Sequence, residues 1–358
     1  MKMKKYMKIK IIIMNYQHQN KIYPVKSPPL GSRFVGKVAI ITESNCWIDR
    51  ATAILMGKEG AKVTIHGTVE KELKETIVKM VRTGIDQDNI LVVQGAIEND
   101  QTLKNLVDKT YNKFGRIDIL VNSAGAIGRQ AQRSNSPASA ISNKQKHIIN
   151  RQNSGNVDSD REENDLIEDD GKPGLGFRNS LASRRRSSHF DSHFDTLFNI
   201  NLKSITKLTR LCVPYLEKVK GAVVNVSSFG GQQAFSDYAY YNTSRVALDN
   251  YCRSIAIKYA QKNVRVNNVR QVKNFFFLNL NVYSPGFITS ESIDEESTVN
   301  KFYLNWIKEH APMARGGTAE EIAKVIAFLA SDDASYVTGS TIVADGGVSI
   351  FSKPADFF

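Results

Sequence analysis

The chain has 358 residues, a length that suits one large α/β domain or two smaller ones. Its formal charge is +12. Residues 1–37 hold nine basic residues and no acid, residues 127–190 hold eleven basic and eight acidic residues, and the remainder of the chain has no net charge. The positive charge therefore belongs to two appendages, and we expect no nucleic-acid binding. Cys46, Cys212 and Cys252 stand alone without metal-ligand spacing, which argues against a disulfide framework and a metal site.

Residues 1–36 form a basic leader that we expect to be disordered. Its apolar run, residues 11–14, is shorter than the roughly seven residues of a signal-peptide core. No stretch of the chain approaches the roughly 20 apolar residues that cross a bilayer. We therefore predict a cytoplasmic protein without a membrane span, while the Lys-rich leader leaves a weak organelle-targeting signal open.

From Lys37 onward, short β-branched runs alternate with amphipathic stretches. This pattern is typical of a parallel sheet with helices on both faces. Four strands and three helices in strict alternation predict a Rossmann-like first half. The strands are expected at residues 38–42, 62–66, 90–94 and 117–121, and the helices at residues 50–58, up to about residue 82, and at residues 100–114.

Two insertions interrupt this alternation. Residues 127–190 are rich in Ser, Asn, Arg and Asp, and they contain too few large apolar residues to offset the entropy of ordering, which predicts a disordered insertion. Residues 271–282 form a short apolar insertion between two strand-like pieces, residues 264–269 and 278–282, and either piece could supply the sixth strand.

Regular structure resumes after the first insertion. Helices are expected at residues 191–219, 240–262 and 319–330, and strands at residues 222–226, 264–269 and 340–343. Without the leader and the insertions about 250 residues remain, the size of one α/β domain. We therefore predict a single domain, residues 37–358, with a doubly wound parallel sheet and two insertions. An alternative is that both insertions are retained intervening sequence.

Candidate catalytic residues follow the fifth strand. Ser228 ends the motif Asn-Val-Ser-Ser, Tyr241 stands thirteen positions later, and Arg245 lies one helical turn beyond the tyrosine. Further short motifs are Asn122-Ser-Ala-Gly125, Asn201 within Asn-Ile-Asn-Leu-Lys-Ser, Pro285-Gly286 and Asp345-Gly-Gly347. In this order and spacing, the chain outside its insertions resembles the short-chain dehydrogenase/reductase family.

The resemblance implies hydride transfer between a nicotinamide cofactor and a small carbonyl or secondary alcohol. Tyr241 would be the acid or base, Ser228 would bind the substrate oxygen, and Asn201 would anchor the water of a proton relay. A tyrosine pKa of about 10 is too high for this work at neutral pH, so a cation such as Arg245 must lower it. The resemblance also implies a homodimer or homotetramer.

A larger set of residues is implied to contact the cofactor. Arg50, together with the absence of an acid after the second strand, favours NADP over NAD. The implied contact residues are Thr42, Ser44, Ile48, Arg50, Asn122, Ala124, Gly125, Tyr241, Arg245, Pro285, Gly286, Ile288 and Thr289.

The chain also departs from the family pattern. Arg245 replaces a lysine, and a guanidinium does not shuttle protons. Glu43, Trp47 and Asp49 replace the three glycines of the phosphate loop, where the backbone must approach a pyrophosphate closely. At two further positions Ala96 replaces an aspartate and Ser123 an asparagine. These changes leave a second hypothesis, a pseudoenzyme that keeps the fold, binds nucleotide weakly and serves as an oligomer or interaction partner.

Overall fold

A computed structural model describes part of the chain, and the elements below belong to one of the two units into which its contacts divide it, Met1–Ala126 together with Thr196–Phe358. Residues 1–30 of the predicted leader and nearly all of both predicted insertions lie outside the described part, so these predictions stay untested there. The last residues of the predicted leader, 31–36, are described, and they are not a disordered tail, because Phe34 is buried in the core and Arg33 pairs with Glu59. The described residues are 31–45, 47–126, 193–232, 238–271, 288–289, 305, 308–309 and 311–350.

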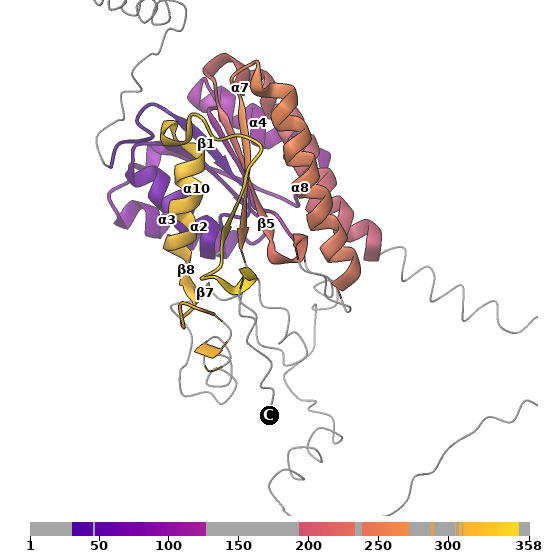
Figure 1. Cartoon of the computed structure of the whole chain (residues 1–358). Coiled ribbons are helices and arrows are strands. Elements are labelled where there is room, and N and C mark those ends of the chain that lie inside the picture. Colours follow the sequence, from indigo (N-terminus) through magenta and orange to yellow (C-terminus); the bar gives the residue numbers. More distant parts are fainter. Residues whose placement is uncertain are drawn as a thin grey trace, which may run out of the picture. The chain divides into compact units, whose positions relative to one another are not determined.

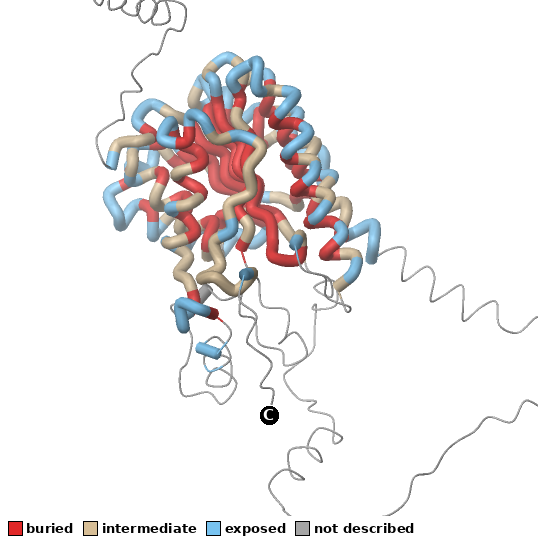
Figure 2. The backbone as a smooth tube through the Cα atoms, viewed as in Figure 1, coloured by how far each residue is buried: buried red, intermediate tan, exposed pale blue. Residues whose placement is uncertain are grey.

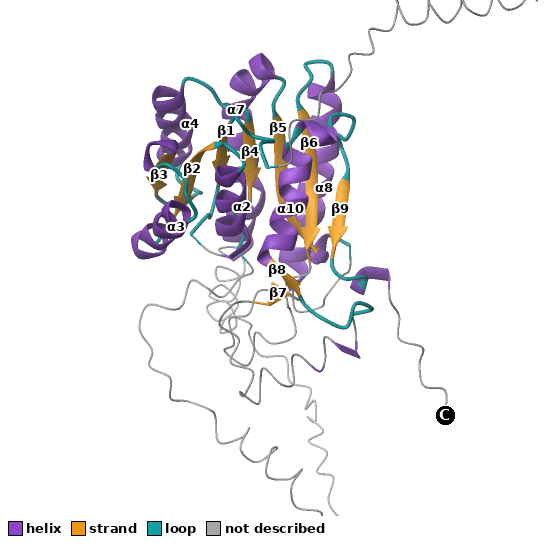
Figure 3. Cartoon of the chain, turned by 90° about the vertical axis from the view of Figure 1, so that its left-hand side faces the viewer, coloured by secondary structure: helices purple, strands orange, loops and turns teal. Residues whose placement is uncertain are grey.

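Seven parallel strands form one sheet in the order β3-β2-β1-β4-β5-β6-β9 (Figure 3). The predicted doubly wound parallel sheet is thereby confirmed. The strands are β1 Val38–Ile41, β2 Lys62–Gly67, β3 Ile90–Gln94, β4 Ile119–Asn122, β5 Ala222–Ser228, β6 Arg265–Gln271 and β9 Thr341–Ala344.

The sixth position in the sheet is taken by the first of the two candidate pieces. Strand β6 begins at Arg265 and pairs with β5 through Gln271, which is the residue at which the sequence predicted the second insertion to begin. The alternative piece, residues 278–282, lies outside the described residues. A second sheet has two parallel strands of two residues each, β7 Ile288–Thr289 and β8 Gly317–Thr318.

Helices cover both faces of the sheet (Figure 1). One face carries α2, α3 and α10, and the other carries α4, α7 and α8. Their bounds are α2 Trp47–Lys58, α3 Glu70–Arg82, α4 Asp100–Phe114, α7 Ser204–Val219, α8 Ala239–Ala260 and α10 Ala319–Ala330. None of the helices within the described residues is long and apolar enough to cross a membrane.

The core lies in two layers because successive strand residues point to opposite faces. In β1, Ala39 and Ile41 pack among α2, α3 and α10, while Ile40 packs among α4, α7 and α8. All four residues of β1 are buried, as an inner strand of a parallel sheet covered on both faces requires. Figure 2 shows this burial along the strands at the centre of the sheet.

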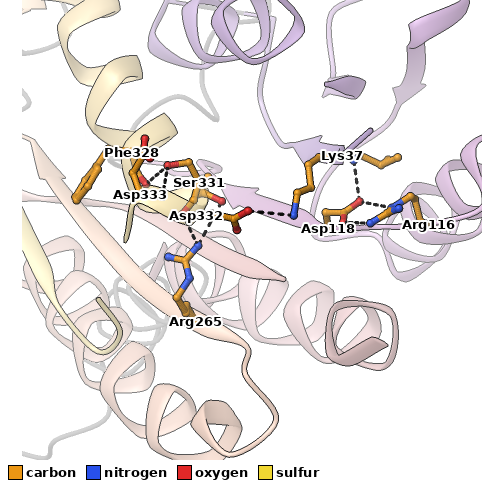
Figure 4. Close-up of polar contacts among 10 residues, drawn as sticks. Lys37, Arg116, Asp118, Arg265, Phe328, Ser331, Asp332 and Asp333 are labelled. Carbon is orange, nitrogen blue, oxygen red and sulfur yellow. Dashed lines mark hydrogen bonds and ion pairs between the residues drawn. The ribbon is translucent and has the colours of Figure 1, made fainter. Parts of the chain in front are cut away.

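Charged residues close the amino edge of the sheet (Figure 4). The Asp118 carboxylate accepts hydrogen bonds from the Val38 amide at 2.9 Å and from both ends of the Arg116 guanidinium fork at 2.6 and 2.8 Å. Nearby, Lys37 pairs with Asp332 at 3.7 Å. This edge therefore has a structural role, and the opposite, carboxyl edge is the one at which sheets of this kind bind ligands.

Candidate active site

Ser228 ends β5 at the carboxyl edge of the sheet. Its side chain is buried, and its Oγ accepts a hydrogen bond from the Gly230 amide at 3.4 Å. The short turn Phe229–Gly231 follows at once. A Cβ atom on Gly230 would lie 2.6 Å from Oδ1 of Asn242 and 3.2 Å from a ring carbon of Tyr241. The absence of a side chain at Gly230 thus lets the Ser228 turn approach Tyr241 closely.

Tyr241 and Arg245 lie one turn apart on α8, and both are almost completely buried, with exposed fractions of 1% and 2%. The guanidinium carbon of Arg245 lies 5.0 Å from the centre of the Tyr241 ring. This is within the range of a cation–π contact. A buried positive charge this close to a phenol favours the ionised form of the hydroxyl.

The same guanidinium of Arg245 also reaches the segment after β4. A Cβ atom on Gly125 would overlap Nη2 of Arg245, so only glycine leaves room for the guanidinium there. Among the described residues, Nε and Nη1 of Arg245 have no hydrogen-bond partner. Buried donors without partners are uncommon and costly, and they indicate a place where a ligand supplies acceptors.

Asn201 lies in a short π-helix, Asn199–Lys203, immediately before α7. Its side chain is fully buried and bonds the protein at both ends. Oδ1 accepts from the Ala126 amide at 2.8 Å, and Nδ2 donates to the Ala126 carbonyl at 2.9 Å and to Oγ of Ser244 at 3.0 Å. Asn201 therefore fixes the chain after β4 to the helix that carries Tyr241, and a π-helix at this position is common at functional sites.

A ladder of buried amides crosses the sheet beneath these residues. Asn122, Asn225 and Asn268 occupy paired positions on β4, β5 and β6. Nδ2 of Asn122 donates to Asn225 at 2.9 Å, and Nδ2 of Asn225 donates to Asn268 at 3.0 Å. Nδ2 of Asn268 then donates to Oδ1 of Asp249 on α8 at 2.8 Å. This amide ladder joins three strands to α8, the helix that carries Tyr241.

The loop between β1 and α2 keeps a glycine-like backbone without glycine. Glu43 has φ 56° and Trp47 has φ 38°, both in the left-handed region. These are two of the three positions at which the sequence lacks the expected glycines. A left-handed backbone costs roughly 1 to 2 kcal/mol for a residue with a Cβ atom. Asp49, at the third position that lacks its expected glycine, is buried in the first turn of α2.

The candidate cofactor residues of this loop all bond the protein itself. Thr42 Oγ1 accepts from the Ser123 amide at 2.9 Å, and Ser44 Oγ donates to the Ile41 carbonyl at 3.0 Å. Arg50 donates to Oγ1 of Thr76 at 2.9 Å and to the Asn45 carbonyl. These contacts tie the loop to β1, β4 and α3.

His66 supports the same loop from the end of β2. Its ring is buried, and desolvation lowers its pKa to about 4. Nδ1 accepts from the Glu43 amide at 3.3 Å, and Nε2 lies 3.0 Å from the Gly95 carbonyl. A neutral ring with the proton on Nε2 satisfies both contacts.

The remaining candidate residues lie at the edges of this site or outside it. Ile48 packs in the core, and the Ala124 amide lies 3.3 Å from Oγ1 of Thr42. Pro285 and Gly286 lie outside the described residues, whereas Ile288 and Thr289 form β7. Ala96 is half-buried beyond the end of β3.

Three residues beside the site were not predicted from the sequence. Asp249, Asn268 and Arg270 join the inner face of α8 to β6 through hydrogen bonds and one ion pair. The spacing of Arg245 and Asp249, four residues apart on one helix, was an available signal. The partners of Asp249 on β6 could be identified only from the alignment of the strands in the folded sheet.

Comparisons with known proteins identify the family of the chain. Residues 37–149 match the family model described as short chain dehydrogenase, and residues 176–273 and 277–349 match the model described as Enoyl-(Acyl carrier protein) reductase. Tropinone reductase-like 3 of Erythroxylum coca is 30% identical over 89% of this chain and 95% of its own length. The 3-oxoacyl-(acyl-carrier-protein) reductase of Thermotoga maritima is 30% identical over 89% of this chain and 100% of its own length.

Two solved structures from Caenorhabditis elegans are also similar. Glucose dehydrogenase in its apo form is 30% identical with a TM-score of 0.62, covering 89% of this chain and 100% of that one. A short-chain dehydrogenase/reductase of unknown function, solved with its cofactor, is 28% identical with a TM-score of 0.65, covering 89% and 97%. With this sheet order and the close grouping of Ser228, Tyr241 and Arg245, the chain belongs to the short-chain dehydrogenase/reductase family of NAD(P)-dependent oxidoreductases.

Proposed function

We propose that the chain interconverts a small carbonyl compound and the corresponding secondary alcohol, with Tyr241 as the acid or base. The observation that carries this proposal is the grouping at the carboxyl edge of the sheet, where the Ser228 turn packs on Tyr241 and the Arg245 guanidinium lies 5.0 Å from its ring. The reductase names of two relatives and the dehydrogenase name of a similar solved structure favour this activity over the pseudoenzyme alternative.

The residues near Arg245 fit a dinucleotide at its nicotinamide end. Nε and Nη1 of Arg245 are buried donors that need acceptors, and ribose hydroxyls would supply them. Gly125 leaves the room in which the guanidinium lies. When bound, the nicotinamide supplies or accepts the hydride. Ser228 would then hold the substrate oxygen while Tyr241 donates or accepts its proton.

The loop between β1 and α2, where the cofactor phosphates would lie, fits the cofactor less well than the residues near Arg245. The loop keeps left-handed backbone at Glu43 and Trp47, but it also carries two acids, Glu43 and Asp49. We propose that the cofactor binds there with reduced affinity, and that its contacts are mainly with backbone amides, because the side chains of Thr42, Ser44 and Arg50 already bond the protein. The preference for NADP loses one support, since Arg50 is engaged with Thr76 and the Asn45 carbonyl.

Asn201 would act through its backbone in a proton relay. Its side chain is engaged with Ala126 and Ser244: both Nδ2 donors are used, and Oδ1 already accepts from the Ala126 amide. A π-helical turn leaves a backbone carbonyl poorly matched to its own helix. We propose that this carbonyl holds the relay water.

Tyr241→Phe tests the proposal. Purified protein is titrated with NADPH and NADH by fluorescence, and turnover is followed with a panel of small ketones and aldehydes. We expect saturable binding and measurable reduction by the wild type. In Tyr241→Phe we expect binding to change less than about twofold while turnover falls by at least about a hundredfold, the size typical of a lost general acid.

Two outcomes would contradict the proposal. An absence of saturable binding up to millimolar cofactor would refute the activity as a whole. Retained turnover in Tyr241→Phe would refute only the acid–base role of Tyr241. Tyr240→Phe is the matched control, because it removes a hydroxyl from the neighbouring residue of the same helix, which we do not place in the site.

A further inference from the structure

The inner face of α8 carries two opposite charges at a spacing that normally pairs them. Arg245 and Asp249 are four residues apart, and residues at this spacing are neighbours on a helix. Both are buried, with exposed fractions of 2% and 3%. Among the described residues, however, the ion pair that Asp249 makes is with Arg270 of β6 and not with Arg245.

Both carboxylate oxygens of Asp249 are engaged on the side of β6. Oδ2 accepts from Nη2 of Arg270 at 2.5 Å, and Oδ1 accepts from Nδ2 of Asn268 at 2.8 Å. Nη1 of Arg270 also donates to Oε1 of Gln232 at 2.8 Å, which fixes the direction of the guanidinium. Only the lack of a side chain at Gly231 allows this arrangement, because a Cβ atom there would lie 2.6 Å from Oδ2 of Asp249.

The cluster therefore has two cations and one anion, and its uncompensated charge lies on Arg245. Its guanidinium points to Gly125 and the Tyr241 ring, and Nε and Nη1 have no protein partner in the described part of the chain. If Asp249 turned toward Arg245, it would neutralise that charge and bring a carboxylate closer to Tyr241. Both effects would disfavour an ionised tyrosine hydroxyl.

We propose that Arg270 is a positioning residue, which holds the Asp249 carboxylate away from Arg245 and so keeps the Arg245 charge available to the Tyr241 hydroxyl and to a ligand. The inference rests on the proposed acid–base role of Tyr241. It gives Arg270 an effect on the site without contact to the reacting atoms.

Few other charges face this cluster within the described residues. On α8 itself the neighbouring titratable groups are Tyr240, the exposed Arg253 and the buried Cys252, whose thiol pKa is raised by burial and by the Asp249 charge. The π-helix contributes Lys203, whose side chain is exposed. The turn Phe229–Gly231 and residues 122–126 contain no titratable side chain. The pairing of Asp249 therefore controls the local charge balance.

The ionisation of Tyr241 can be measured without substrate or cofactor. Protein labelled with carbon-13 at the tyrosine Cζ is titrated by NMR, and the Tyr241 signal is assigned by its loss in Tyr241→Phe. The measurement compares the wild type with Arg270→Met, Asp249→Asn and the double variant Asp249→Asn/Arg270→Met. Arg270→Lys is the conservative control, since it retains a cation that can hold Asp249.

We expect Arg270→Met to raise the pKa of Tyr241 by about one pH unit, a tenfold fall in its ionised fraction at a given pH. The double variant should return near the wild-type value, because the carboxylate that acts on Arg245 is then absent. Arg270→Lys should stay close to the wild type.

Two results would overturn the proposal. Equal Tyr241 titration in the wild type and Arg270→Met would show that Asp249 does not reach Arg245. A rise that persists undiminished in the double variant would show that the Arg270 charge acts directly. If Arg270→Met does not fold, the comparison of Arg270→Lys, Arg270→Gln and Asp249→Asn/Arg270→Gln decides between the same outcomes. The acid–base role of Tyr241 fails separately, by retained turnover in Tyr241→Phe, and the proposed activity fails by an absence of saturable cofactor binding.

Discussion

Glu43 and Trp47 hold left-handed backbone although each carries a large side chain. The strain persists because the loop is held by surrounding contacts, including the bond from the Glu43 amide to His66 and the bonds of Arg50 to Thr76 and the Asn45 carbonyl. A residue in such a conformation costs roughly 1 to 3 kcal/mol. The loop thus has left-handed backbone at two positions but lacks the glycines that adopt this conformation without cost.

Replacing Glu43 by glycine should relieve this strain. We expect Glu43→Gly to raise the free energy of unfolding by about 1 kcal/mol, after the added entropy of an unfolded glycine is subtracted. Glu43→Ala is the matched control, since it removes the charge and keeps the strain. Urea denaturation of the wild type, Glu43→Gly and Glu43→Ala measures their relative stability, and Glu43→Gly should be the most stable of the three.

The triple variant Glu43→Gly/Trp47→Gly/Asp49→Gly should also bind NADPH more tightly by fluorescence titration, and unchanged affinity would show that the loop does not limit binding.

His66 gives the chain a pH-dependent term in its stability. Burial lowers its pKa from 6.5 to about 4, so the unfolded chain takes up the proton at the higher pH. The stabilisation is complete above about pH 6.5 and is lost as the pH falls toward 4, with a total of roughly 3 kcal/mol. Urea unfolding of the wild type and His66→Gln between pH 7 and pH 4.5 checks this. The difference between the two proteins should shrink with falling pH, and a constant difference would contradict the prediction.

At the scale of elements, helix caps explain which predictions from the sequence succeeded. The helices predicted at residues 100–114 and 319–330 have those bounds in the structure. Asn99 accepts from the Gln101 amide, and Gly115 ends its helix in a left-handed conformation. Thr318 and Glu321 form a capping box. Local side-chain chemistry sets these boundaries, so it is readable from sequence.

Other features depend on contacts between distant residues and could not be read. The helix expected from residue 191 contains a π-helical turn at Asn199–Lys203, which apolar periodicity does not reveal. Non-glycine residues disfavour left-handed backbone, so the positive φ of Glu43 and Trp47 was not predictable. The engagement of Arg50 with Thr76, 26 residues away, likewise required the packing of α2 on α3.

Arg265 stabilises the carboxyl end of α10 from strand β6 (Figure 4). It donates to the carbonyls of Leu329 at 2.6 Å and Ser331 at 2.8 Å, and burial lowers its pKa. Arg265→Met would remove the Arg265 donor from the Leu329 carbonyl and one of the two donors of the Ser331 carbonyl, which also accepts from the Ala334 amide, and we expect a loss of about 2 kcal/mol in urea unfolding. Arg315→Met is the control, because its pair with Glu321 is exposed and should be worth at most about 1 kcal/mol. Equal losses would contradict the argument.

At the scale of the molecule, the outer side of α8 presents apolar residues to solvent. Val246 is 49% exposed and Ile257 is 79% exposed. These positions fit the homodimer or homotetramer that the family resemblance implies. We expect Val246→Glu/Ile257→Glu to reduce the molar mass measured by light scattering to that of one chain. Val81→Glu, on the exposed side of α3, should leave it unchanged. A wild-type protein that is already a single chain would contradict the prediction.

The amide ladder also bears on how the chain reaches its native pairing. Parallel strands have no tight turn to set their alignment, and a slip of one residue reverses the face of every side chain. A slip between β4 and β5 or between β5 and β6 would separate Asn122, Asn225 and Asn268 and bury their amides unpaired, at about 1 to 3 kcal/mol each. We therefore expect the three asparagines to disfavour misaligned strands, and Asp249 to join α8 only to the sheet whose ladder is correctly paired.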